Sequence, residues 1–425
     1  AGVCVQNVHA GRQTPVCRSA SVGRGTVLVW VEKVVMPKIN PAQSLVDLLR
    51  QRGMLNDPQV AEALLAVPRH LFLPDAPLEQ VYSDESVAVK TDLRGDATCS
   101  DTMPSMVAHL LQQLALKRGQ NVLHIGTGTG YVSALIAYLI GREEGTVTTI
   151  EIDRDIAKEA EMNLVKNGYS MVKVVNTDGA EGYAPRAAYD RIVATCGVWD
   201  IPPAWVKQLK PEGRLIAPIW IDGLQVMASF SLQPDGTLYA ENVIPSAFVY
   251  IRGIAEGPIV RKFVGSTELL LLADEIDEID SVALSLLLAH DAEICHLSAP
   301  LNTIEYWYGF IPFLMLNEKD RDVFALYTIR DNYQAFGMDG EGFALLSQAS
   351  ASFVPYYGLG RAHCFAGSDA FIEIETQLDR WQLAGRPTID RLRMRLIPNA
   401  NEMPKITTGK LYPRRHHQLH VWLDL

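Results

Sequence analysis

The sequence predicts an α/β protein in which a largely parallel sheet carries helices on both faces, followed by a second, α+β domain. Three observations support this prediction. Strand-like and helix-like stretches alternate between residues 121 and 218. A glycine-rich corner joins an apolar strand to a helix within that stretch. After Gly223 the apolar residues recur at every second position, which is typical of antiparallel strands.

The alternating stretch accounts for the first domain. Helical spacing of apolar side chains precedes it near residues 44–49, 60–65 and 106–116. Within the stretch we expect strands at residues 122–125, 147–152, 172–175, 191–195 and 214–218, and helices at residues 131–140, 156–167 and 203–209. Gly141 and the pair Asn167-Gly168 mark two of the helix ends. Such alternation favours a doubly wound, parallel sheet.

The remainder of the chain follows a different pattern. Residues 226–232 and 243–251, joined by the turn Pro234-Asp235-Gly236, predict an antiparallel pair that closes the edge of the sheet. From residue 255 onward a helix is expected at residues 281–289, a strand near residues 323–329 and a helix at residues 368–384. We therefore expect domains at residues 36–253 and 254–425, and a flexible or extraneous leader at residues 1–35.

Composition excludes several classes of protein. The formal net charge of −11 makes nucleic acid a poor partner, because the molecule as a whole repels polyanions. The six cysteines are widely separated and form neither a disulfide framework nor a metal-ligand spacing, so we expect no metal and a reducing, cytoplasmic location. No apolar run approaches the roughly 20 residues that span a bilayer.

The glycine-rich corner carries the strongest chemical signal. Glycines at positions 126, 128 and 130 let the backbone lie against a ligand at a helix N-terminus. Position 131 is Tyr131, so the loop departs from the nicotinamide fingerprint and fits an S-adenosylmethionine loop instead. Glu151, at the end of the next strand, is the preferred ligand for the ribose hydroxyls, with Asp153 as its competitor. Asp178, followed by Gly179, faces the adenine amino group or caps the next element.

Eight motifs in order resemble the protein-L-isoaspartate (D-aspartate) O-methyltransferase family across roughly residues 57 to 253. They are VPRHLFLP (67–74), VYSD (81–84), PSMVA (104–108), HIGTGTGY (124–131), DG (178–179), YDRIV (189–193), IP (201–202) and GRLIAP (213–218). The resemblance implies a Rossmann-like class I methyltransferase fold with an N-terminal helical cover on the substrate side. It also implies S-adenosyl-L-methionine as cofactor, bound by Gly126, Thr127, Gly128, Gly130, Tyr131, Glu151, Asp178 and Gly179.

The family esterifies a peptide carboxylate, and this reaction needs no base, metal or covalent nucleophile. A carboxylate is already ionised at pH 7, and positioning supplies most of the catalysis. In the family a Thr-Ile-Ser-x-Pro-like segment provides the hydroxyl at the substrate, and alignment on Pro104 places Thr102 there, with Ser100 as the alternative. The resemblance also implies substrate contacts from Tyr82, Asp101, Met103 and Pro104.

Two positions depart from the family pattern. Asp101 would oppose an anionic substrate unless its side chain points away, and with Ser100 it is alternatively a cap for the helix at Pro104. His124 stands where the family usually has an acid that organises the loop and the cofactor's amino group. We interpret His124 as a core histidine whose hydrogen bonds are satisfied.

The chain also resembles longer relatives that methylate ribosomally made peptides such as lanthipeptides, lasso peptides and graspetides, with WQLAGRP (381–387) in the matching C-terminal part. We therefore expect methylation of an aspartyl or isoaspartyl carboxylate, favouring a dedicated constrained peptide whose ester collapses to a succinimide. General isoaspartyl repair, a non-catalytic peptide-binding module and a small-molecule methyltransferase are the alternatives. A monomer is plausible.

Overall fold

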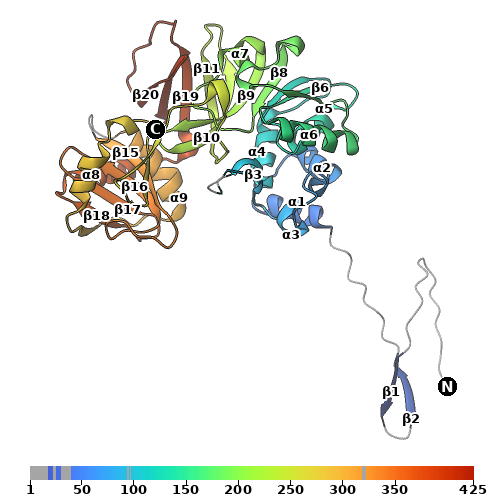
Figure 1. Ribbon diagram of the computed structural model, residues 1–425, viewed down its shortest axis with the longest axis horizontal. Helices are drawn as coiled ribbons and strands as arrows, with labels where there is room; N and C mark the ends of the chain where they lie inside the picture. Colours follow the sequence, from blue (N-terminus) through green and yellow to red (C-terminus); the bar gives the residue numbers. More distant parts are fainter. Residues whose placement is uncertain (1–17, 23–24, 30–39, 93–94, 96, 318–321) are drawn as a thin grey trace.

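The first sheet of the computed structural model contains ten strands, in the order β20-β21-β19-β11-β10-β9-β8-β5-β6-β7. The structure describes residues 18–22, 25–29, 40–92, 95, 97–317 and 322–425 (Figure 1). The strands span Asn121–Ile125 (β5), Thr146–Glu151 (β6), Lys173–Asn176 (β7), Tyr189–Ala194 (β8), Leu209–Ile221 (β9), Leu224–Leu232 (β10), Leu238–Pro245 (β11), Leu392–Pro398 (β19), Lys410–Pro413 (β20) and His417–Leu423 (β21).

Helices cover both faces of the parallel half of this sheet. Those of the first part of the chain span Pro41–Gln51 (α1), Pro58–Ala66 (α2), Leu78–Val81 (α3), Pro104–Leu114 (α4), Tyr131–Ile140 (α5), Arg154–Lys166 (α6) and Pro203–Gln208 (α7). The side chains of Asn40 and Asp57 cap α1 and α2, each with proline as the first helical residue. Helices α1, α2, α4 and α5 share one buried apolar cluster with Val122 and Val193 of the sheet. The predicted doubly wound fold is confirmed.

Chain order reverses at the centre of the parallel half. Strand β5 pairs in parallel with β6 on one side and with β8 on the other. Strands β7 and β9 continue the parallel pairing outward from β6 and β8. In open α/β sheets, ligands bind outside the carboxyl ends of the strands at such a reversal. The fold therefore places a candidate site next to the loop after β5.

The antiparallel half of the sheet extends beyond the predicted edge. Strands β9, β10 and β11 pair antiparallel, joined between β10 and β11 at the predicted turn. The expectation that this pair closes the sheet is wrong, because residues 238–240 of β11 pair with residues 394–396 of β19. Strands β21 and β20 follow β19. The C-terminal strands of the chain thus complete the first sheet.

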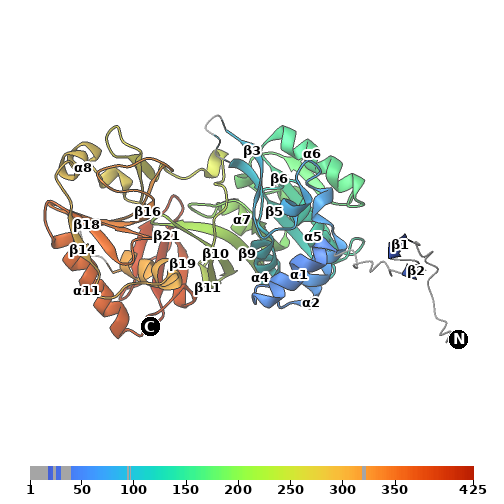
Figure 2. The ribbon, with the colours of Figure 1, turned by 90° about the horizontal axis from the view of Figure 1, so that it is seen from below.

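A second sheet is antiparallel throughout and has the order β12-β13-β15-β16-β17-β18-β14. Its strands span Arg261–Phe263 (β12), Leu269–Leu272 (β13), Glu293–His296 (β14), Val323–Ile329 (β15), Glu341–Leu346 (β16), Ala351–Pro355 (β17) and Arg361–Phe365 (β18). The helices in this part of the chain span Ser281–Leu288 (α8), Thr303–Glu305 (α9), Ile311–Met315 (α10) and Asp369–Leu383 (α11). Figure 2 shows this sheet beside the first one, with β19 and β21 toward it.

A single apolar cluster links the two sheets. It contains Ile192 and Leu215 of the parallel half, Leu396 of β19, and Phe310 and Trp381 next to the second sheet. All five side chains are almost completely buried. Burial of such side chains stabilises a fold by about 1.5–3 kcal/mol each. The division of the chain at residues 253 and 254 stays a prediction.

Smaller elements complete the structure. Strands Arg18–Val22 (β1) and Gly25–Val29 (β2) pair antiparallel, and the rest of the predicted leader at residues 1–35 lies outside the described residues. Strands Val87–Thr91 (β3) and Ala97–Asp101 (β4) form a second hairpin-like pair. Short helical turns occur at Arg69–Leu71, Gly179–Glu181, Ala184–Arg186, Gly253–Ala255, Ile276–Glu278, Tyr306–Phe310 and Ile389–Arg391. Within the described stretches, no helix has the length and apolar character needed to cross a bilayer.

Candidate active site

A cavity lies at the carboxyl ends of β5, β6 and β8. Strand β4 and the segment that follows β11 complete its wall. The lining residues are Thr98, Cys99, Ser100, Ile125, Gly126, Gly128, Ile150, Glu151, Ile152, Gly179, Thr195, Cys196, Val249, Tyr250, Ile251 and Arg252. The cavity therefore joins segments from three separate regions of the chain at the reversal point of the sheet.

The glycine loop lines this cavity at Gly126 and Gly128, and its backbone adopts left-handed conformations that favour glycine. Gly126 has φ +91°, and a Cβ there would lie 3.0 Å from the hydroxyl of Thr195. Gly128 has φ +54°. Gly130 has φ +91° and immediately precedes α5, where an added Cβ would meet Leu164 at 3.1 Å. The loop backbone is thus exposed to a ligand on one side and packed tightly on the other.

Glu151 presents a buried carboxylate to the cavity. Its side chain is 7% exposed, and its two oxygens accept hydrogen bonds from the amides of Gly128 at 3.1 Å and Asp153 at 3.2 Å. Burial raises the pKa of Glu151, and these two N–H groups oppose that rise. A carboxylate that two backbone N–H groups hold in place at a strand end is suited to accept hydrogen bonds from hydroxyl groups of a ligand.

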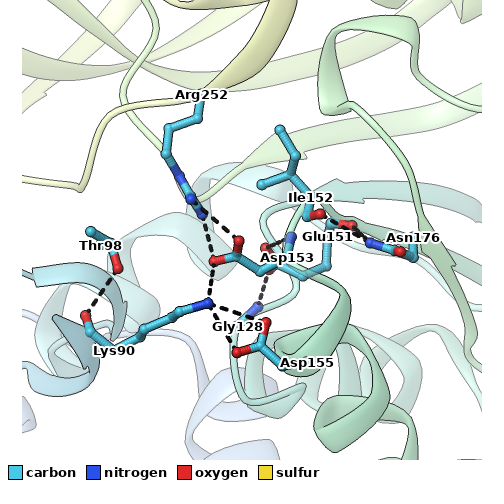
Figure 3. A network of polar contacts seen from close by, with 9 residues as sticks. All are labelled: Lys90, Thr98, Gly128, Glu151, Ile152, Asp153, Asp155, Asn176 and Arg252. Atoms are coloured by element: carbon cyan, nitrogen blue, oxygen red, sulfur yellow. Dashed lines mark hydrogen bonds and ion pairs between the residues drawn. The ribbon is translucent and has the colours of Figure 1, made fainter. Parts of the chain in front are cut away.

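Asp153, the alternative candidate for binding the ribose hydroxyls, forms ion pairs at the rim of the cavity (Figure 3). Its carboxylate meets the guanidinium of Arg252 at 2.8 Å and the ammonium of Lys90 at 3.3 Å. Lys90 also pairs with Asp155 at 2.9 Å. Arg252 lowers the pKa of Asp153 by its hydrogen bonds and charge, with a further contribution from Lys90. The geometry therefore favours Glu151 over Asp153 as the ligand-facing acid.

The predicted adenine-side pair separates in the structure. Gly179 lines the cavity, and an added Cβ there would meet Ile125 at 2.7 Å. The carboxylate of Asp178 instead accepts from the amides of Ala180 and Ile254, both at 2.8 Å. Asp178 therefore caps the turn at Gly179, as the alternative interpretation proposed, and a contact from it to the cofactor stays a prediction.

Strand β4 contributes two hydroxyl-bearing residues to the cavity wall. Thr98 and Ser100 line the cavity, whereas Thr102 does not. Asp101 is buried and points away from the cavity: it pairs with Arg69 at 2.7 Å and accepts from the hydroxyl of Thr129 at 2.8 Å. The structure thus brings Ser100, the alternative position, into the candidate site.

Five further predicted residues lie outside the cavity wall. Pro104 is the first residue of α4 and Met103 directly precedes it. The hydroxyl of Tyr82 lies 2.7 Å from Nδ1 of His70. Tyr131 is buried against Phe72. Thr127 is also buried, with its hydroxyl 2.8 Å from that of Thr149. Their parts in binding stay predictions.

Two thiols of the cavity wall are poor nucleophiles. Burial, followed by the charge of Glu151, raises the pKa of both Cys99 and Cys196 to about 12. A thiol with such a pKa is almost entirely protonated at pH 7. The site therefore offers no thiolate for covalent catalysis.

Similarity to known proteins decides the family. A family model described as protein-L-isoaspartate(D-aspartate) O-methyltransferase matches residues 40–255, just over half of the chain. The chain belongs to this family. It is an S-adenosylmethionine-dependent carboxyl O-methyltransferase, as the resemblance of its motifs predicts.

Individual relatives agree over the same half of the methyltransferase. The protein-L-isoaspartate O-methyltransferase of Ignicoccus hospitalis is 36% identical over 208 residues, covering 49% of this chain and 95% of the relative. That of Methanopyrus kandleri is 35% identical over 212 residues, covering 50% and 91%. A solved structure titled protein-L-isoaspartate O-methyltransferase aligns over 90% of this chain and all of its own, with a TM-score of 0.50 and 21% identity. This last likeness confirms the Rossmann-like fold.

The cavity fits the cofactor of the family. The methyltransferase would hold S-adenosylmethionine with the glycine loop backbone, with Glu151 at the ribose hydroxyls and with the apolar side chains of Ile150 and Ile152. An added Cβ would contact Thr195 at position 126 and Ile125 at position 179, so the lining of the cavity requires glycine at both positions. When bound, S-adenosylmethionine supplies an activated methyl group on a sulfonium.

Sequence reasoning missed several residues of this site. Thr195, Tyr250 and Arg252 line the cavity of the methyltransferase, yet none of them belongs to a recognised motif. Thr195 is the last residue of the strand predicted at residues 191–195 and directly follows the observed β8, and a position at the carboxyl end of such a strand is a usable signal for a ligand-facing residue. Arg252 is brought to the rim by the long connection after β11, and its sequence neighbourhood carries no comparable signal.

Proposed function

We propose that the enzyme methylates a free carboxylate in a peptide or protein, either the α-carboxylate of an isoaspartyl residue or the side-chain carboxylate of an aspartyl residue. The observation that carries this proposal is the position of Ser100, on the wall of the same cavity as Gly126 and Gly128. The relatives from Ignicoccus hospitalis and Methanopyrus kandleri are named protein-L-isoaspartate O-methyltransferases, which supports the isoaspartyl form of the substrate.

The residues around the cavity suit a reaction governed by positioning. A substrate carboxylate is ionised at pH 7 and is itself the nucleophile, so no side chain has to remove a proton. The hydroxyl of Ser100 donates a hydrogen bond to one carboxylate oxygen and leaves the other free to form the new bond to the methyl carbon. Holding the two reacting groups in line contributes most of the rate enhancement. Apolar wall residues such as Ile125 and Ile251 exclude water from the reacting groups.

A second candidate is a dedicated tailoring enzyme for a constrained peptide. The observation that favours it is the extent of the chain, since the curated relatives match about half of it. The second sheet and its share of the common apolar cluster lie in the half that these sequence relatives leave unmatched, whereas a solved structure titled protein-L-isoaspartate O-methyltransferase aligns over 90% of the chain. In this case the neighbouring backbone amide nitrogen attacks the new ester carbonyl, methanol leaves and a succinimide results.

Intact-mass measurement of three substrates tests these proposals. A linear isoaspartyl peptide, its aspartyl twin and a macrocyclic aspartyl peptide are each incubated with enzyme and S-adenosylmethionine. Gain of one methyl group on the isoaspartyl peptide alone supports repair-type chemistry. Methyl gain followed by net loss of water on the macrocycle supports the dedicated enzyme. Absence of methyl gain on all three contradicts the proposed substrate class.

A further inference from the structure

His124 lies in β5, two residues before the first glycine of the loop, and is fully buried. Its ring contacts hydroxyl groups from three other elements. Nδ1 lies 2.8 Å from the hydroxyl of Ser133 in α5 and 3.2 Å from that of Thr149 in β6. Nε2 lies 2.9 Å from the hydroxyl of Thr195, directly after β8. The ring therefore ties together the elements that meet at the reversal point of the sheet.

Counting protons fixes the direction of these hydrogen bonds. The hydroxyl of Thr195 donates its single proton to the carbonyl of Gly126, at 2.8 Å, so it accepts from Nε2 of His124. Burial lowers the pKa of His124 to about 3, so the ring is neutral and carries one proton. That proton resides on Nε2, and Nδ1 accepts from the hydroxyl of Ser133.

The end of this chain of hydrogen bonds is the cavity wall itself. Thr195 and Gly126 both line the cavity. The position of the Thr195 hydroxyl is constrained by Nε2 of His124 at 2.9 Å and by the carbonyls of Gly126 at 2.8 Å and Ile125 at 3.3 Å. The amide of Thr195 adds a hydrogen bond to the carbonyl of Ile125 at 2.9 Å. Rotation of the His124 ring would therefore disturb the hydrogen bonds of two residues that line the cavity.

We propose that His124 is a positioning residue for the cofactor, acting through a directional relay from Ser133 through His124 and Thr195 to the carbonyl of Gly126. The relay fixes the first glycine of the loop in its ligand-binding position without placing a charge beneath it. A buried donor or acceptor left without its partner costs free energy, so an unbroken relay stabilises one conformation of the loop. This proposal concerns binding of the cofactor and does not depend on which substrate the enzyme methylates.

Calorimetric titration with S-adenosylhomocysteine tests the relay independently of any substrate. We expect His124→Asn to weaken binding about tenfold, the effect of one lost buried hydrogen bond. We expect the same substitution to change affinity less than twofold in a Thr195→Val background, because the relay is already broken there. Thr195→Ser retains the hydroxyl and is expected to bind within twofold of wild type. Ser352→Ala removes a fully buried hydroxyl in β17 and serves as the control for a general loss of stability.

Two outcomes would overturn the proposal. One is a folded His124→Asn variant that binds within twofold of wild type. The other is multiplicative effects of His124→Asn and Thr195→Val, which would mean that the residues act independently. If His124→Asn does not fold, the nitrogen chemical shifts of the wild-type ring at pH 7 decide the matter. A proton on Nε2 alone supports the relay, and a proton on Nδ1 contradicts it.

Discussion

The guanidinium of Arg252 and the carboxylate of Asp153 form a two-point ion pair across the rim of the cofactor cavity. The two contacts measure 2.8 Å and 3.3 Å. Because Arg252 follows β11 and Asp153 precedes α6, the pair joins the antiparallel half of the first sheet to the parallel half. Because the carboxylate of Asp153 is engaged in this ion pair, Glu151 is the acid available to bind the cofactor.

Loss of the Arg252 guanidinium should weaken cofactor binding. We expect Arg252→Ala to reduce the affinity for S-adenosylhomocysteine several-fold, because Asp153 then keeps only its ion pair with Lys90 and its negative charge beside Glu151 is less compensated. The pair is partly exposed, so the effect should shrink at high salt. Calorimetric titration at two salt concentrations measures it. Arg118→Ala, which breaks an exposed pair with Glu144, is the control and should leave affinity unchanged.

Ser100 and Thr102 can be separated by kinetics. We expect Ser100→Ala to lower kcat/KM for a carboxylate substrate about tenfold, because it removes one hydrogen bond in the transition state. Its affinity for S-adenosylhomocysteine should stay within twofold of wild type. Thr102→Val should have little effect, since Thr102 lies off the cavity wall. The reverse ranking of the two variants would restore Thr102 as the substrate hydroxyl.

Cofactor affinity should depend on pH through Glu151. Burial raises the pKa of Glu151 above the 4.5 of an exposed glutamate, and ribose hydroxyls need the ionised form as acceptor. Affinity for S-adenosylhomocysteine should therefore fall as pH decreases through this raised pKa. Glu151→Gln should bind about tenfold more weakly at pH 7 and lose this pH dependence. A wild-type affinity that stays constant down to pH 4.5 would contradict the assignment.

The raised pKa of Glu151 affects the stability of the unliganded enzyme in the opposite direction from cofactor affinity: as pH rises, affinity should increase and stability should decrease. The folded state holds the proton of Glu151 more tightly than the unfolded state does. Its contribution to the free energy of unfolding should therefore decrease as pH rises from the unfolded pKa through the folded one. Comparison of wild type with Glu151→Gln in urea titrations across this range isolates the contribution.

The buried pair of Arg69 and Asp101 should govern stability more than chemistry. Arg69 is 1% exposed, contacts Asp101 at 2.7 Å and donates to the carbonyl of Val81 at 2.8 Å. Removing one partner of a buried pair typically costs about 3–5 kcal/mol, so Arg69→Met should lower the free energy of unfolding by that amount.

An exposed pair provides the control for this prediction. Arg386→Ala, which removes the exposed partner of Glu305, should cost less than about 1 kcal/mol. Urea titrations of both variants give the two free energies. Equal losses would show that burial of Arg69 and Asp101 adds nothing.

The sequence predicted the parallel half of the fold well because its signals are local. The glycines around residue 128 mark the corner between β5 and α5, and the observed helix Tyr131–Ile140 agrees with the expected one. The strand at residues 323–329 was also predicted with its observed bounds. In each case the apolar spacing and a turn residue lie within a few positions of each other, so no distant contact was needed.

Distant pairing explains what the sequence did not predict. Tyr239 of β11 pairs with Arg395 of β19, and no pattern in either strand identifies its partner 156 positions away. The same limitation applies at the site, where Arg252 meets Asp153 only after the chain has completed the antiparallel strands. The preference for Thr102 over Ser100 came from alignment on Pro104, whereas the path of β4 determines which hydroxyl lines the cavity.

Tandem mass spectrometry of a methylated isoaspartyl peptide tests the central claim most directly. The peptide carries one isoaspartyl residue, one ordinary aspartate and a free C-terminus, and it reacts with enzyme and S-adenosylmethionine. We predict a single added methyl group on the free α-carboxyl of the isoaspartyl residue, and about tenfold less of this product with Ser100→Ala at limiting enzyme. Methylation confined to the C-terminus or to a nitrogen atom would contradict the account.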